Sequence, residues 1–192
     1  MSINIVLCGV GGQGTVLASK IMAKAAMNKG LRVMSAETIG MAQRGGSVFS
    51  FLKIGDDVVS PMMGRGSADV ILGFEPGETV RMLPYLKDGG AVIVNTRAVK
   101  PTTATLSGAD YSGEEMVNYL KANVNDITVV DGDKACTELG SSKVLNVVLL
   151  GAAVRTGKLG LTEDDIKEAM KETVKEKFLP LNHKALEYTG NN

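Results

Sequence analysis

The sequence has few of the residues on which most self-contained active sites depend. Its 192 residues include one histidine, His183, and two cysteines, Cys8 and Cys136. His183 lies in a helix-like stretch near the C-terminus, supports no Ser-His-Asp set, and is interpreted as structural. No cluster has the spacing of metal ligands. Two cysteines cannot supply the four thiolates of an iron–sulfur cluster, and without a disulfide framework we expect a cytoplasmic protein.

Excess charge and long apolar runs are absent as well. The 21 basic residues equal the 21 acidic ones, which argues against a general nucleic-acid or membrane-surface binder. The longest apolar stretch, Val144–Val154, is too short to span a membrane and contains Asn146. We expect no signal peptide, because the N-terminus lacks its charged and apolar regions. The run Asp131-Gly132-Asp133-Lys134 begins like a thiamine-diphosphate motif but has no suitably spaced asparagine, so it is interpreted as the polar end of a strand.

What the sequence does contain is a glycine-rich turn, Cys8-Gly9-Val10-Gly11-Gly12-Gln13-Gly14, between an apolar run and a helical stretch. Gly9, Gly11 and Gly14 occupy the three positions of G-x-G-x-x-G, in the strand–turn–helix order of a mononucleotide-binding unit. Free N–H groups and the positive helix end would stabilise an anion there. The alternative is a tight turn without a ligand. The Gln13 amide either bonds a ligand or braces the loop.

A second irregular segment, Glu37 to Val48, follows the second predicted strand. Glu37 comes 23 residues after Gly14, near the place of the acidic residue that holds a ribose in dinucleotide sites. Gln43-Arg44-Gly45-Gly46-Ser47 combines a guanidinium, two glycines and a hydroxyl, a set that suits a phosphate or carboxylate. The alternatives are that Glu37 is a solvated carboxylate and that Arg44 is a surface arginine. The two segments together predict a ligand site at the carboxyl edge of a sheet.

The hydrophobic pattern alternates strands with helices and predicts one α/β domain over residues 1–192, Rossmann-like, with a mostly parallel sheet flanked by helices. An antiparallel hairpin is expected at Val48–Ile54 with Asp57–Ser60 as its return strand. The apolar helix expected at Ser141–Thr156 is buried in this chain or against another, so a homodimer in isolation is possible. The other predicted strands are Ile3–Leu7, Leu31–Met34, Asp69–Gly73, Ala91–Val94 and Ile127–Val130. The other predicted helices are Thr15–Lys29, Glu75–Leu86, Gly113–Asn123, Thr162–Phe178 and Leu181–Tyr188. A capping box of Thr162 and Asp165 begins the fourth of these, and Pro180 is expected to end it.

The two glycine-rich segments together resemble the gamma-type domain of the 2-oxoacid:ferredoxin oxidoreductases that act on pyruvate, 2-ketoisovalerate or indolepyruvate. The resemblance is greatest to the beta subunit of the indolepyruvate branch, and it covers nearly the whole chain. Three further segments carry it: Asp69-Val70-Ile71-Leu72-Gly73-Phe74-Glu75-Pro76, Gly89-Gly90-Ala91-Val92-Ile93-Val94-Asn95, and Asn182 to Gly190.

This resemblance implies a subunit that is inactive alone. The family oxidatively decarboxylates 2-oxoacids with coenzyme A as co-substrate and passes the electrons to ferredoxin. Thiamine diphosphate and iron–sulfur clusters are then expected on a larger partner chain, with no cofactor held by this chain alone. Carried over to this sequence, Gly11–Gly14 and Gln43–Gly46 become loops of a coenzyme A or interface site. The alternatives are a free-standing NAD-binding module that uses Gly9–Gly14 and Glu37, and a purely structural partner subunit.

Overall fold

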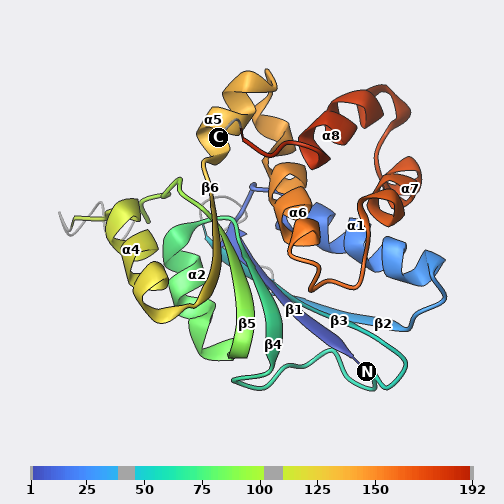
Figure 1. Ribbon diagram of the computed structural model, residues 1–192, viewed down its shortest axis with the longest axis horizontal. Helices are drawn as coiled ribbons and strands as arrows, with labels where there is room; N and C mark the ends of the chain where they lie inside the picture. Colours follow the sequence, from blue (N-terminus) through green and yellow to red (C-terminus); the bar gives the residue numbers. More distant parts are fainter. Residues whose placement is uncertain (1, 39–45, 102–109, 191–192) are drawn as a thin grey trace.

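A computed structural model describes residues 2–38, 46–101 and 110–190 and shows a single six-stranded sheet with helices on both faces (Figure 1). The strand order is β2-β3-β1-β4-β5-β6. The strands are β1 (Ile3–Val10), β2 (Val33–Thr38), β3 (Ser47–Ile54), β4 (Ala68–Gly73), β5 (Leu86–Asn95) and β6 (Asp126–Val130). The predicted α/β fold with a mostly parallel sheet is therefore confirmed.

The antiparallel strand is present, but its predicted partner is wrong. β3 does not fold back on Asp57–Ser60, which forms no strand, and instead lies between β1 and β2 and is antiparallel to both. An apolar strand followed by a Gly-Asp turn matches a local hairpin, whereas pairing to β1 gives all eight residues of β3 a partner on a mostly apolar, buried strand. β1 and β2, which run parallel to each other, are therefore separated by β3.

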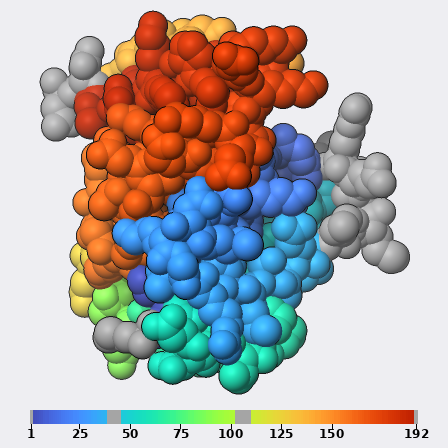
Figure 2. Space-filling model, turned by 90° about the vertical axis from the view of Figure 1, so that its right-hand side faces the viewer, coloured from blue at the N-terminus to red at the C-terminus, as the bar shows by residue number. Residues whose placement is uncertain are grey.

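Two layers of helices enclose the sheet. The first contains α1 (Thr15–Asn28), α6 (Leu145–Arg155), α7 (Glu163–Thr173) and α8 (Leu179–Leu186), and the second contains α2 (Pro76–Met82) and α4 (Gly113–Asn123). Figure 2 shows α1, in blue, beneath the red and orange helices of the first layer. Ile5, Leu7 and Leu72 point into the core under this layer, while Val6, Cys8 and Ile71 point into the core under the second. The alternation along each strand follows from the pleat.

Several helix boundaries differ from the predicted ones. The helix predicted at Glu75–Leu86 is α2 followed by the 3₁₀ turn Leu83–Tyr85, and the one at Ser141–Thr156 is a 3₁₀ turn, Ser142–Val144, followed by α6. The helix predicted to reach Phe178 stops at Thr173, and the 3₁₀ turn Glu176–Phe178 precedes α8. Pro180 lies in the first turn of α8 rather than ending a helix, since proline is tolerated in a first turn. The predicted capping box is present, with Thr162 and Asp165 satisfying each other's backbone N–H groups.

α6 is apolar on nearly every side because this chain itself surrounds it. Its residues from Asn146 to Val154 are all buried, and it packs against α1, α5 (Gly132–Glu138), α8 and the sheet. Its composition therefore gives no reason to expect a second chain on it, which removes one argument for the predicted homodimer. Among the described helices none is long and apolar enough to cross a membrane.

Candidate functional site

The two glycine-rich segments meet at the carboxyl edge of the sheet. β3 runs beside β1, so that Val10 lies opposite Ser47 and Gly9 opposite Val48. The Gly11 N–H donates a hydrogen bond of 2.9 Å to the Gly46 carbonyl oxygen. Of the predicted second loop, Gly46 and Ser47 are thus placed beside the glycine turn, whereas Gln43, Arg44 and Gly45 lie outside the described residues.

Gln13 braces the turn from within. Its Oε1 accepts a hydrogen bond from the Val10 N–H at 2.7 Å, and its Nε2 donates to the Phe74 carbonyl oxygen at 3.1 Å. Gly9 leaves room for this bridge, because a Cβ there would lie 2.6 Å from Gln13 Oε1. Both polar atoms of the amide are therefore used inside the protein, as one of the two sequence-based interpretations predicted.

The first turn of α1 carries no side-chain cap. Gly14 precedes the helix at φ +87°, no side chain in the described part of the chain caps the first-turn N–H groups, and no acidic residue lies in that turn. Gly12 at φ +101° completes a loop that L-residues would strain. A 14-residue helix with open N–H groups presents a partial positive charge, so this end favours an anion.

A cavity of about 420 Å³ lies at this helix end. It is lined by the loop Gly12–Gly14 and Leu17 and by Arg97, Lys143 and Asn146. Among the residues that the structure describes, no carboxylate lines the cavity. The Arg97 guanidinium pairs with Asp133 at 3.0 Å outside it, and both side chains are largely exposed. Two cations and a helix N-terminus facing one space make the cavity suited to a phosphate-bearing ligand.

Glu37 does not reach this cavity. It is exposed on β2, where it lies opposite Ser50 of β3, and Ser50 in turn lies opposite Leu7 of β1. Two strand spacings of about 4.8 Å thus separate its backbone from β1. The predicted ribose contact depended on β2 lying next to β1, and the inserted β3 removes that neighbourhood.

Two buried carboxylates, Glu75 and Glu78, accept hydrogen bonds from segments that surround the site. Sequence reasoning did not identify them. Glu75 accepts hydrogen bonds from the Tyr111 hydroxyl at 2.9 Å and the Val99 N–H at 3.2 Å. Glu78 accepts from the Ser47 hydroxyl at 2.5 Å and pairs with Arg81. Burial, followed by the Glu75 hydrogen bond, raises the pKa of Tyr111, which therefore remains a proton donor at neutral pH. The Ser47 hydroxyl is likewise engaged inside the protein.

The described residues offer no activated nucleophile among the cysteines. Burial, above all, raises the pKa of the Cys8 thiol, and burial followed by the nearby Asp133 carboxylate raises that of Cys136. No three His, Cys, Asp or Glu side chains of the described chain gather as metal ligands. Asp131 caps α5 by accepting from the Lys134 N–H, so the polar run after β6 begins a helix that was not predicted.

The sequence matches the pyruvate ferredoxin/flavodoxin oxidoreductase family over residues 4–191. The chain belongs to this family. It is 39% identical over 186 residues to indolepyruvate oxidoreductase subunit IorB of Pyrococcus horikoshii, covering 96% of this chain and 92% of that one. It is 40% identical to the Archaeoglobus fulgidus subunit of the same name, covering 97% and 92%.

Solved structures of the family share the fold. The keto/oxoacid ferredoxin oxidoreductase gamma subunit from Geobacter sulfurreducens superimposes with a TM-score of 0.70 at 24% identity, covering 97% of this chain and 93% of that one. The 2-oxoglutarate:ferredoxin oxidoreductase from Magnetococcus marinus gives 0.71 at 18% identity, and there the match covers 97% of this chain but only 30% of that one. The gamma-type resemblance inferred from the motifs, with its indolepyruvate branch, is confirmed.

Sequence reasoning missed the cationic wall of the cavity. Arg97 comes two residues after β5 and lies at the carboxyl edge by the same argument that placed the glycine turn there, so its position was a usable signal. Lys143 and Asn146 belong to the turn and helix after α5. Only the packing of α6 beside α1 brings them to the cavity, and no local pattern signals that.

Proposed function

We propose that this chain is the small subunit of a 2-oxoacid:ferredoxin oxidoreductase and is inactive alone. The substrate class is arylpyruvates such as indolepyruvate, decarboxylated oxidatively to an acyl-CoA while ferredoxin is reduced. Four relatives at 34–40% identity carry the name indolepyruvate oxidoreductase subunit IorB, which supports this choice. Thiamine diphosphate and iron–sulfur clusters belong to the larger partner chain, since two cysteines here cannot ligate a cluster.

The observation that carries the proposal is the cationic cavity at the N-terminus of α1. Coenzyme A bears a pyrophosphate and a further phosphate, and Arg97, Lys143 and the open N–H groups supply three kinds of donor for them. Gly12, Gln13 and Gly14 of the glycine turn line this cavity, and the segments Gly9–Gly14 and Gln43–Ser47 are assigned to the same coenzyme A or interface site. The Magnetococcus marinus relative, which contains this fold in part of its length, was solved with coenzyme A bound.

A free-standing NAD-binding module is the weaker candidate. The exposed Glu37 lies on β2, which β3 separates from β1 and its glycine turn, so the residue expected to hold a ribose is out of reach. The Gln13 amide, a further polar group in the loop, already hydrogen-bonds to the backbone of Val10 and Phe74. The NAD hypothesis therefore loses its residue-level support, whereas the phosphate-binding end of α1 is common to both hypotheses.

Calorimetric titration with coenzyme A and with NAD separates these functions. Replacing Lys143 or Arg97 by alanine removes one charge-assisted contact worth about 1.5–3 kcal/mol, so coenzyme A affinity falls about 10- to 100-fold. Lys20→Ala, an exposed lysine on α1, is the matched control and leaves affinity unchanged. NAD binding that Glu37→Ala weakens would contradict the proposal. Intact assembly with the partner chain but no coenzyme A binding would assign the loops to a protein interface.

A further inference from the structure

Asn146 carries a buried amide without a hydrogen-bond partner. The residue lies in the first turn of α6 and is only 3% exposed. Neither polar atom of its side chain hydrogen-bonds to a group in the described part of the chain. Burying an unpaired amide costs free energy, because water no longer solvates it. A leucine, which has the same branching, would fill this helix position without that cost, so packing alone does not account for the amide.

The Asn146 amide lies against the start of α1. A Cβ added to Gly14 would come within 3.1 Å of the Asn146 Cβ, Cγ and Nδ2 atoms. Asn146 also lines the cavity of about 420 Å³ at this helix end. The unpaired amide and the uncapped first turn of α1 therefore border the same space, and they are two independent indications of a ligand there.

A second helix begins at the same cavity. α6 has no side-chain cap and no acidic residue in its first turn, and its first two residues, Leu145 and Asn146, both line the cavity. Each helix start carries about half a positive charge. Lys143 adds a full charge, since it has no acidic partner among the described residues, whereas Arg97 shares its charge with Asp133. The helix starts and Lys143 thus present about two positive charges to one space.

We propose that this cavity binds a pyrophosphate group and that the Asn146 amide donates a hydrogen bond to it. A pyrophosphate diester, as in coenzyme A, carries about two negative charges at neutral pH, and its two phosphoryl groups allow one to face each helix start. Asn146 belongs to α6 and contacts Gly14 at the start of α1, so its amide lies where the two phosphoryl groups meet. The inference rests on the proposed function for the choice of coenzyme A as the ligand.

The neighbouring space suits a pyrophosphate better than a terminal phosphate. A further cavity of about 720 Å³ shares Arg97, Ser142 and Leu145 with the first one. The pyrophosphate lies in the middle of coenzyme A, so the ligand must continue beyond it on both sides. The adjoining cavity provides room for one of these continuations.

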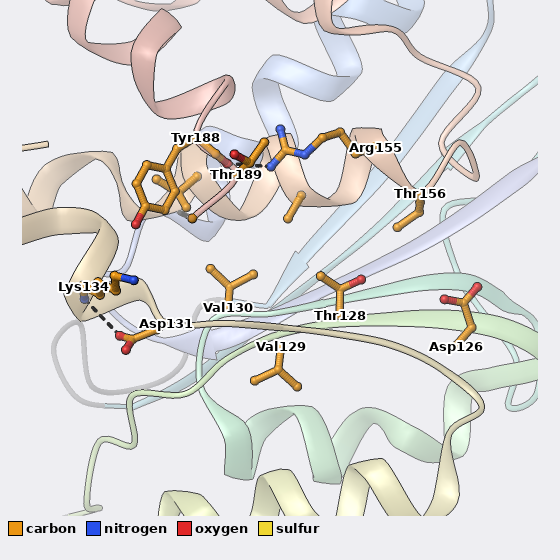
Figure 3. A pocket seen from close by; sticks show the side chains of 13 residues that line it. Asp126, Thr128, Val129, Val130, Asp131, Lys134, Arg155, Thr156, Tyr188 and Thr189 are labelled. Atoms are coloured by element: carbon orange, nitrogen blue, oxygen red, sulfur yellow. Dashed lines mark hydrogen bonds between the residues drawn. The ribbon is translucent and has the colours of Figure 1, made fainter. Parts of the chain in front are cut away.

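The cavity between β6 and α6 is built differently. Its volume is about 440 Å³, and Figure 3 shows Asp126 and Asp131 among the side chains that line it. The Arg155 guanidinium, which also lines it, donates to the carbonyl oxygens of Leu186 and Tyr188 at 2.8 and 2.7 Å. Two carboxylates disfavour an anion, so the pyrophosphate is assigned to the cavity at α1 and not to this one.

Calorimetric titration with inorganic pyrophosphate tests the assignment without coenzyme A. We expect the affinity to fall about tenfold in Asn146→Leu, which removes the donor. It should fall further in Asn146→Asp, which keeps the shape of the side chain and adds a negative charge. An original chain that does not bind pyrophosphate, or two Asn146 variants that bind it as tightly as the original chain, overturns the proposal.

Asn182 provides the matched control. It is a buried asparagine that does not line the cavity, and its amide donates to the Phe178 carbonyl oxygen at 2.8 Å. Asn182→Leu should therefore leave the pyrophosphate affinity unchanged and lower the urea midpoint, whereas Asn146→Leu should keep or raise the midpoint, because the Asn146 amide has no partner to lose. A midpoint that falls equally in both variants gives Asn146 a structural role and overturns the proposal.

Coenzyme A and 3′-dephospho-coenzyme A identify the phosphate that is bound. Both contain the pyrophosphate, so Asn146→Leu should weaken their binding by the same factor. Weaker binding of coenzyme A alone would assign the cavity to the 3′-phosphate and overturn the proposal. If neither coenzyme binds while pyrophosphate binding still depends on Asn146, the coenzyme A function fails and the pyrophosphate site stands.

Discussion

Replacing Gln13 by alanine should destabilise the protein without removing a ligand contact. The change leaves the Val10 N–H without its acceptor, and Val10 is only 6% exposed. The Phe74 carbonyl oxygen keeps a second donor, the Asn95 side-chain amide at 3.1 Å. One unsatisfied buried N–H costs about 1–3 kcal/mol of unfolding free energy, or a Tm lower by about 2–12 °C for a chain of this length.

Urea unfolding followed by circular dichroism measures this loss, and the midpoint should fall at constant slope. Gln13→Glu is the matched variant. Its carboxylate still accepts from Val10 but sets a second oxygen against the Phe74 carbonyl, which raises the pKa of the new carboxyl group. Its stability deficit should therefore shrink as pH falls below that pKa, while the alanine deficit stays constant. Alanine stability within about 0.5 kcal/mol of the original, with weakened coenzyme A binding, would refute the bracing role.

Further predictions concern the turn and the helix caps. Gly14→Ala, at φ +87° and with its Cβ 3.1 Å from Asn146, should cost about 1–2 kcal/mol in the same urea assay, whereas Gly140→Ala lacks the Asn146 contact and should cost less. Thr162→Ala removes one half of the capping box and should cost about 1 kcal/mol. Hydrogen bonds from Thr162 and Lys29 outweigh desolvation and lower the pKa of Asp165, so its stabilisation holds above the unfolded pKa of about 3.9 and is lost as pH falls through the folded value. Asp165→Asn should flatten this acid limb, and an unchanged limb would contradict the assignment.

The sequence predicted the elements of the fold better than their pairing. The strand–turn–helix unit at Gly9–Gly14 and the capping box at Thr162 depend on neighbours in the chain, and both are confirmed. The place of β3 between β1 and β2 depends on contacts distant in sequence, and a local turn at Gly55 favoured the wrong partner. Because β3 lies between β1 and β2, Glu37 on β2 is also distant from the site.

Some features of the candidate site could likewise be predicted from the sequence, and others could not. The meeting of the two glycine-rich segments followed from their shared position at the carboxyl edge, and the Gly11–Gly46 hydrogen bond agrees with it. Lys143 reaches the cavity only because α6 packs beside α1, and Glu75 is recognisable as an anchor only once Tyr111 and Val99 are seen to donate to it. Periodicity carries no signal for either residue.

The central claim is that this chain supplies part of a site whose chemistry belongs to a larger chain. Its most direct test is an assay of indolepyruvate- and coenzyme A-dependent ferredoxin reduction with the separated and the recombined subunits. We expect no turnover by this chain alone, and activity when the thiamine- and cluster-bearing chain is added back. Turnover by the isolated chain, or full activity of the larger chain without it, would contradict the account.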